Sequence, residues 1–284
     1  MEASEGSFLT SFWRYVNPNA VAGFAAGFVS SSVLYPLEVV KSRFQVGTHS
    51  SFSYKSSISA LRSIYAAGGI QDLYRGFPAG LAGSSLSWGL YFWLYNNFKT
   101  SISQTRGASS PGAIDHWSSS ILSSVVVQTL LCPLWVVKLN QQLGNTNGFW
   151  SALRSLSEKE GIRGLYRGLL PGYWSSIHLG FQLVIYEELK RSTADSLVAG
   201  TIIATIGSKS IATLLTSPIE VVKTRLRSSQ VSLDHNVRSI SVEIWRREGF
   251  RGFYRGMGPA LIRILPSQCL TFVTFETVKS ILSS

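Results

Sequence analysis

Long stretches without charged side chains alternate with short charged segments along the whole chain. Six such stretches cover residues 15–37, 76–98, 116–137, 168–186, 196–219 and 256–275. The last two are each interrupted by one cation, Lys209 and Arg263 respectively. Because about 20 apolar residues in a helix span the hydrocarbon core of a bilayer, the pattern predicts six transmembrane helices.

The six stretches are not uniform blocks of leucine and isoleucine, because each mixes glycine, serine and aromatic residues with aliphatic ones. Such a mixture suits a helix with one face toward lipid and another toward a polar cavity, where a charge inside the membrane is tolerated. The alternative is a soluble helical enzyme with long core helices. A chain of 284 residues is too short to bury six helices of this length. The predicted fold class is therefore an all-α membrane protein.

One sequence pattern occurs three times along the chain. Pro-Leu-Glu-Val-Val-Lys starts at residue 36, Pro-Leu-Trp-Val-Val-Lys at 133 and Pro-Ile-Glu-Val-Val-Lys at 218. A Tyr-Arg-Gly triplet follows each hexapeptide, at residues 74–76, 166–168 and 254–256. Each unit contains an uncharged helix, a basic amphipathic segment and a second uncharged helix. Since internal periodicity of this kind decides the fold, we divide the chain into three two-helix repeats at residues 12–107, 108–193 and 194–284.

The charge balance indicates that the protein handles anions. The chain contains 26 Lys+Arg and 15 Asp+Glu, a formal net charge of +11, yet only 14% of its residues are charged. Two cysteines without C-x-x-C spacing exclude a disulfide framework. A soluble nucleic-acid-binding protein would carry its cations along one exposed stripe, whereas these cations cluster near helix ends. Four scattered histidines, with no Ser/His/Asp grouping and no metal-ligand spacing, argue against an enzyme or a metal site.

The repeated pattern resembles the mitochondrial carrier family along essentially the whole chain. That family repeats P-x-[DE]-x-x-[KR]-x-[KR] and then [DE]-G-x-x-x-x-[WYF]-[KR]-G three times. This sequence departs from the pattern at Gly68 in the first repeat, and at Trp135 and Asn140 in the second. The resemblance implies a pseudo-threefold barrel of six helices in the mitochondrial inner membrane, with a central cavity that opens alternately to either side. It also implies bound cardiolipin at the Tyr-Arg-Gly triplets, no cofactor and a monomer.

The resemblance further implies two gates made of polar residues. It pairs Glu38 with Lys138 and Glu220 with Lys41, while Trp135 leaves Lys223 without an acidic partner. The matrix gate comprises Glu38, Lys41, Gln45, Lys138, Gln142, Glu220 and Lys223. The cytoplasmic gate comprises Tyr95, Asn96, Lys99, Tyr186, Glu187, Lys190, Glu276 and Lys279. Trp135 and Asn96 each replace an acid, so we expect both gates to be weaker than complete ones.

The residues that break the threefold pattern are the candidates for substrate binding. Lys209 and Arg263 are lone cations in apolar stretches, and a lone intramembrane cation needs a buried acid or an anionic ligand. Tryptophan and histidine side chains offer flat surfaces on which a heterocycle can stack. The candidate substrate-binding residues are Trp88, Trp135, Trp174, Ser175, His178, Gln182, Lys209 and Arg263.

Longer strings narrow the resemblance to the mitochondrial folate/FAD carrier branch. Ser87-Trp88-Gly89-Leu90-Tyr91-Phe92, His178 with Gln182, and Leu261-Ile262-Arg263 are similar to sequences of that branch. The branch implies transport of FAD, folate or both by alternating access, and two cations suit the diphosphate of FAD. Folate as sole cargo and a pyrimidine-nucleotide or NAD carrier are the alternatives within transport, and a non-transporting membrane scaffold is the alternative outside it. Exchange and uniport are both open.

Overall fold

The computed structural model describes residues 18–47, 56–105, 113–144, 148–175, 182, 185–186, 188–190, 197–231 and 235–283. The described residues are helical apart from short turns and caps, as the sequence predicts. Five helices are long: α2 (Pro18–Val46), α4 (Phe77–Thr105), α5 (Ala113–Gln142), α9 (Leu197–Arg227) and α11 (Met257–Ser283). A shorter helix, α7 (Leu169–Ser175), begins the remaining predicted span, and residues 182, 185–186 and 188–190 of that span are also helical.

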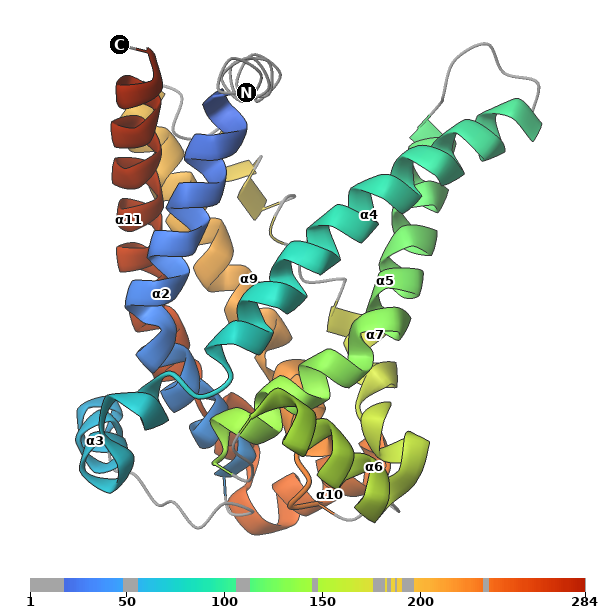
Figure 1. Ribbon diagram of the computed structural model, residues 1–284, viewed down its shortest axis with the longest axis vertical. Coiled ribbons are helices and arrows are strands. Elements are labelled where there is room, and N and C mark those ends of the chain that lie inside the picture. The colour runs from blue at the N-terminus through green and yellow to red at the C-terminus, as the bar shows by residue number, and fades with distance from the viewer. Residues whose placement is uncertain are drawn as a thin grey trace, which may run out of the picture.

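In each repeat, one short helical segment joins the first predicted span to the second, which gives three such segments. They are α3 (Ser57–Leu73), α6 (Phe149–Leu165), and α10 (Val237–Glu248) followed by the turn η2 (Phe250–Tyr254). In Figure 1 these short helices lie together at one end of the molecule, and the long helices rise from them. The far end of α4 leans away from α2 and α11, so the long helices are together at the lower end and spread at the upper end.

The repeated Val-Val pair of each hexapeptide explains where the short helices lie. Val39 and Val40 of α2 pack against Ala60 and Ile64 of α3 in one buried cluster. The other two repeats use the same positions, with Val136, Val137, Ala152 and Leu156 in one cluster and Val221, Val222, Ile240 and Ile244 in the other. Burying each valine, leucine or isoleucine side chain of these clusters stabilises the fold by about 1.5–3 kcal/mol. The amphipathic segments therefore fold back as a base for the long helices.

The residue before the second helix of each repeat is a glycine in the left-handed region. Gly76, Gly168 and Gly256 have φ angles of +78°, +65° and +80°. A side chain there would also meet backbone, because a Cβ on Gly256 would lie 2.9 Å from the carbonyl oxygen of Lys41. The glycine of each Tyr-Arg-Gly triplet thus permits a sharp turn that presses against the end of an adjacent long helix.

Large apolar side chains are exposed along the outer surface of the long helices. Among them, Phe24 is 70% exposed, Trp93 63%, Ile203 59% and Val273 61%. By length and composition alone, two helices qualify as membrane spans, Val21–Val46 and Ser118–Gln142, and only 33% of each qualifying window is buried. A core helix of a soluble protein would be mostly buried, so the exposed apolar surface indicates contact with lipid.

A glycine substitution tests the turn at the base of α11. We expect Gly256→Ala to lower the free energy of unfolding by about 2 kcal/mol or more, because alanine is strained at positive φ and its Cβ approaches backbone. Gly258→Ala is the matched control, since no atom lies within 4 Å of a Cβ at that helical position. Thermal unfolding of the two purified variants checks the difference, and equal melting temperatures would contradict it.

Candidate functional site

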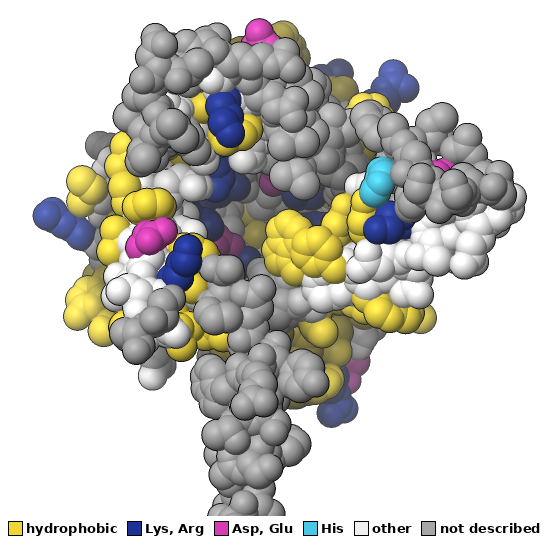
Figure 2. All heavy atoms as spheres, turned by 90° about the horizontal axis from the view of Figure 1, so that it is seen from above, with side chains coloured by type: hydrophobic (Ala, Val, Ile, Leu, Met, Phe, Trp, Pro, Cys, Tyr) yellow, Lys and Arg dark blue, Asp and Glu magenta, His cyan; other side chains and the backbone are white. Residues whose placement is uncertain are grey.

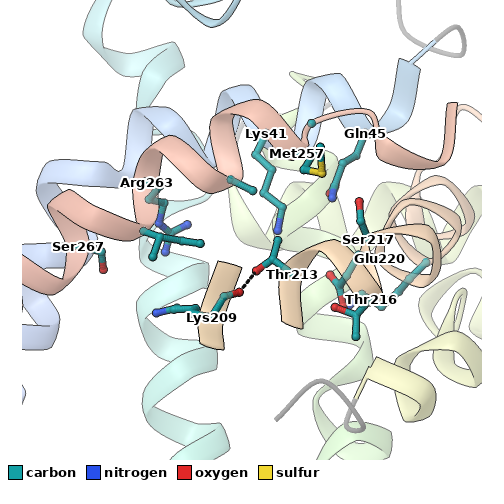
Figure 3. A pocket seen from close by; sticks show the side chains of 14 residues that line it. Lys41, Gln45, Lys209, Thr213, Thr216, Ser217, Glu220, Met257, Arg263 and Ser267 are labelled. Atoms are coloured by element: carbon teal, nitrogen blue, oxygen red, sulfur yellow. Dashed lines mark hydrogen bonds and ion pairs between the residues drawn. The ribbon is translucent and has the colours of Figure 1, made fainter. Parts of the chain in front are cut away.

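A cavity of about 390 Å³ lies between α9, α11 and the end of α2. Its lining carries four cations, Lys41, Lys209, Lys223 and Arg263, and one acid, Glu220. Figure 3 shows Lys41 reaching from α2 toward α9, with Arg263 of α11 near Lys209. Seen from above in Figure 2, the molecule is hollowed at its centre, with both kinds of charged side chain deep in the hollow and hydrophobic side chains at its edge. This excess of positive charge favours an anionic ligand.

One carboxylate joins the cavity to the residues of the predicted matrix gate. Oε1 of Glu38 lies 2.5 Å from Nζ of Lys138, the ion pair that the sequence predicts. Oε2 of the same residue lies 3.0 Å from Nη1 of Arg263. Sequence reasoning missed this second contact, because it assigned Arg263 to the substrate and Glu38 to the gate. A single acid therefore connects α2, α5 and α11.

The other charged residues of the matrix gate also lie together. Nζ of Lys223 is 2.5 Å from Oε1 of Glu220, one turn earlier in α9. Lys41 lines the same cavity as this pair, so the pairing of Lys41 with Glu220 stays a prediction. Lys223 therefore pairs with an acid of its own helix. The neighbouring second repeat has Trp135 at the position where the family pattern has an acid.

The Trp135 ring lies against the lysine of its own motif. Nζ of Lys138 is 5.0 Å from the centroid of the ring, which is a cation–π distance. The Trp135 ring also packs against α4. A Cβ added to Gly83 of α4 would lie 3.5 Å from two atoms of that ring and 2.6 Å from the Leu134 side chain. The indole therefore packs over Gly83 and holds Lys138 in this conformation.

Two glutamines reinforce the matrix gate by hydrogen bonds between repeats. Oγ of Ser42 donates to Oε1 of Gln142 at 2.8 Å, and Oγ1 of Thr224 donates to Oε1 of Gln45 at 3.0 Å. Each bond links a hydroxyl next to the gate lysine of one helix with a glutamine four residues after the gate lysine of another. The arrangement ties α2 to both α5 and α9.

The corresponding contact between α5 and α9 is different. Leu139 stands where the other repeats have Ser42 and Thr224, and Arg227 stands where they have a glutamine. Nε and Nη2 of Arg227 are buried without a hydrogen-bond partner, and its guanidinium lies beside the thiol of Cys132. An unmade buried hydrogen bond is unfavourable. The α5–α9 contact therefore lacks the hydroxyl–glutamine bond, although Asn140 of α5 donates to the carbonyl oxygen of Arg227 and accepts from the backbone N–H of Ser229.

Outside the spans, a second ion pair joins the second repeat's motif residues. Nε of Arg167 lies 3.0 Å from Oε2 of Glu160, and both side chains are largely buried. Burial raises the pKa of the Glu160 carboxyl, although Arg167 opposes that shift. The third repeat has a fuller version, in which Glu248 contacts both Arg225 and Arg255.

The lysines of the predicted cytoplasmic gate rest on aromatic rings of their own helices. Lys99, Lys190 and Lys279 lie 5.5, 5.7 and 5.9 Å from the ring centroids of the residues four positions earlier, Tyr95, Tyr186 and Phe275. The hydroxyl of Tyr95 is 2.5 Å from Nδ1 of His116 on α5, a residue that sequence reasoning did not single out. Each of these ring contacts lies within one helix, and α4 leans away from α2 and α11 at this end in Figure 1.

The remaining candidate residues are distributed over several helices. Trp88 on α4 and Trp174 on α7 are 57% and 58% exposed. Asn96 is exposed on α4, Glu276 is exposed on α11, and Gln182 is partly buried. His178, Glu187 and the side chain of Ser175 lie outside the described part of the chain. Within the described residues, no group of three or more His, Cys, Asp or Glu residues is arranged to hold a metal ion.

The shared carboxylate makes a strong prediction for stability. We expect Glu38→Gln to lower the free energy of unfolding by about 2 kcal/mol, or roughly 4–8 °C in melting temperature, because Lys138 and Arg263 lose their common acid. Glu158→Gln is the matched control, since that acid pairs with Arg154 on an exposed helix surface and its loss should matter little. The same melting temperature for Glu38→Gln and the unmodified protein would rule out this role.

The hydroxyl–glutamine bond that the α5–α9 contact lacks can be introduced by design. We expect Leu139→Ser combined with Arg227→Gln to recreate the hydroxyl–glutamine bond of the other two contacts. The double variant should then be more stable than the sum of the two single changes by about 1 kcal/mol, the net contribution of one hydrogen bond. Thermal or denaturant unfolding of all four proteins measures this coupling, and strictly additive effects would contradict it.

Comparisons with known proteins agree with the repeats and with the fold. A family model described as mitochondrial carrier protein matches residues 13–106, 109–197 and 193–284. The chain is 33% identical to "Folate transporter 1, chloroplastic" of Arabidopsis thaliana over 96% of this chain and 97% of the relative. It is 33% identical to "Nicotinamide adenine dinucleotide transporter 1, chloroplastic" of Arabidopsis thaliana, over 92% and 90% respectively. It is 29% identical to "Mitochondrial nicotinamide adenine dinucleotide transporter 1" of Saccharomyces cerevisiae, over 90% and 75%.

Members of this family are membrane-embedded transporters and not enzymes, and their fold has six spans in three repeats. The predicted fold class is confirmed on that basis, as is the prediction that the protein is not an enzyme. With three matched repeats that together cover nearly the whole sequence, the chain belongs to the mitochondrial carrier protein family.

Proposed function

We propose that the protein carries an anion with a planar heterocycle across an organellar membrane. FAD and folate are candidates, and NAD is an equally supported alternative. The observation that carries this proposal is the cavity in which Lys41, Lys209, Lys223 and Arg263 face a single lining acid. Diphosphate and dicarboxylate groups both match a pair of cations such as Lys209 and Arg263. The named substrates of the similar transporters, folate and nicotinamide adenine dinucleotide, have these features.

Alternating access follows from the shared carboxylate of Glu38. An anion that binds Arg263 competes with Glu38 for the guanidinium and brings negative charge close to that carboxylate. Both effects weaken the contacts that hold α2, α5 and α11 together at the matrix end. Occupancy of the cavity would thereby favour opening of the matrix gate, while an empty cavity keeps it closed.

The membrane assigned to the protein is the mitochondrial inner membrane, on the strength of the family. Two of the similar transporters are named as chloroplastic, so a plastid envelope is the alternative. A lipid phosphate such as that of cardiolipin suits the Tyr-Arg-Gly turns, where a cation stands beside the start of a helix. The proposed unit of transport is the monomer, as the resemblance to the family implies.

Uptake into liposomes tests the substrate. We expect liposomes containing the purified protein to take up at least one of radiolabelled FAD, folate and NAD, measured in parallel with and without internal nucleotide. Dependence on internal nucleotide would identify exchange, and its absence would identify uniport. Uptake of none of the three would refute the proposed function.

Arg263 is the residue whose removal should matter most for uptake. We expect Arg263→Ala to abolish uptake without loss of folded protein, because the cavity loses the cation that contacts both ligand and Glu38. Arg154→Ala is the control, since that arginine is exposed on α6 far from the cavity lining. Unchanged transport kinetics for Arg263→Ala would remove this residue from the binding site.

A further inference from the structure

Aromatic side chains form a row along one side of α4. The row consists of Trp88, Tyr91, Phe92 and Tyr95. Trp88 and Phe92 are about one helical turn apart, and so are Tyr91 and Tyr95. It continues toward the end of α4 that carries Lys99, and none of its members lines the cavity that holds Lys209 and Arg263. The row is therefore a separate surface from the cluster of cations.

The rings of the aromatic row form two nearly flat pairs. Trp88 and Phe92 have centroids 5.7 Å apart and an interplanar angle of 23°, and Tyr91 and Tyr95 have centroids 6.0 Å apart with an angle of 12°. Trp88 also meets Tyr91 edge to face at 6.2 Å. Trp88 is 57% exposed and Phe92 is 54% exposed, so the first pair presents open ring surface.

The second pair is fixed to the neighbouring helix by hydrogen bonds. The Tyr91 hydroxyl lies 2.8 Å from Oγ of Ser120, and the Tyr95 hydroxyl lies 2.5 Å from Nδ1 of His116. Both partners belong to α5. A ring that is already held in place loses little conformational freedom when a ligand binds, so these bonds pre-organise the surface.

The depth of the row relative to the cations follows from the repeats. Arg263 stands eight residues after the arginine of its Tyr-Arg-Gly triplet, and Gly83 stands eight residues after its own, so the two mark one level of the pseudo-threefold barrel. Trp88 comes five residues later and Tyr95 twelve residues later. At 1.5 Å per residue, the row extends from about 7 Å to about 18 Å above the level of Arg263.

We propose that the aromatic row binds the planar heterocycle of the transported anion while Arg263 and Lys209 bind its charged groups. This inference rests on the proposed function and deepens it. Aromatic side chains can stack on heterocycles with different substituents, because every such ring has a π face. Ser120 and His116 act as positioning residues, since they hold the phenols and make no contact with the ligand themselves. Because the aromatic row and the cations lie at different levels along the barrel, the site favours elongated anions that carry the ring at one end.

Hydrophobic side chains border the central hollow in Figure 2, as a binding surface of this kind requires. Contact with lipid is the other common use of an exposed tryptophan. Trp93 of the same helix is 63% exposed and lies about 140° around the helix from Trp88, so it lies away from the row. The two tryptophans thus form a matched pair, one on the row and one away from it.

Equilibrium dialysis of the purified protein with radiolabelled FAD, folate and NAD tests the proposal. We expect Trp88→Ala to weaken binding of the heterocyclic anion about tenfold, while Trp88→Phe and Trp93→Ala stay within about threefold of the unmodified protein. Competition by inorganic pyrophosphate, an anion without a ring, should be unchanged in Trp88→Ala. His116→Ala and Ser120→Ala should weaken binding of the heterocyclic anion by about threefold, again with unchanged pyrophosphate competition.

Three results would overturn the proposal, two of them from the Trp88→Ala variant. One is equal binding of the heterocyclic anion by Trp88→Ala and the unmodified protein; the other is a parallel loss of pyrophosphate competition, which would indicate general damage to the cavity. Absence of binding of all three heterocycles by the unmodified protein would count against the row as well. Binding without uptake into liposomes would instead refute the proposed function and leave the aromatic row standing.

Discussion

The arrangement of the helices depends on one carboxylate, that of Glu38. Its two oxygens contact cations from two different helices, Lys138 of α5 and Arg263 of α11. A charge in the interior of a membrane protein must be paired, and removal of one partner leaves the others uncompensated. Glu38 therefore joins the residues of the predicted matrix gate and the cavity residue Arg263 in one electrostatic unit.

The pseudo-threefold symmetry is broken where the chain needs asymmetric chemistry. Two of the contacts between neighbouring repeats use a hydroxyl and a glutamine, whereas the third repeat pair has Leu139 and Arg227 at those sequence positions. Trp135 stands in the same part of the second repeat and holds Lys138 by its ring. A gate that opens in every cycle must not be too stable, because a deep minimum on one side would trap the carrier there. The α5–α9 contact has no hydroxyl–glutamine bond, but Asn140 bonds there to the backbone of Arg227 and Ser229.

The two ends of the molecule hold their lysines in different ways. At the end that carries the short helices, Lys138 and Lys223 are bound to carboxylates. At the other end, Lys99, Lys190 and Lys279 lie over rings of their own helices. An exposed cation–π contact is worth about 0.5–1 kcal/mol. In the described part of the chain, the Glu38–Lys138 pair joins two helices, whereas each of these ring contacts lies within one helix.

Local structure was determined by the sequence itself. The uncharged stretches, the hexapeptides and the left-handed glycines specify the helices and turns, because these depend on neighbouring residues. Contacts between distant helices were decided by the tertiary structure. Arg263 and Glu38 are 225 positions apart, and Tyr95 meets His116 across two helices. The sequence pattern does not determine how far α4 leans from α2. This packing of the helices determines which of their side chains meet. The cations of the site were thus predictable, whereas their common acid and the anchors of the aromatic row were not.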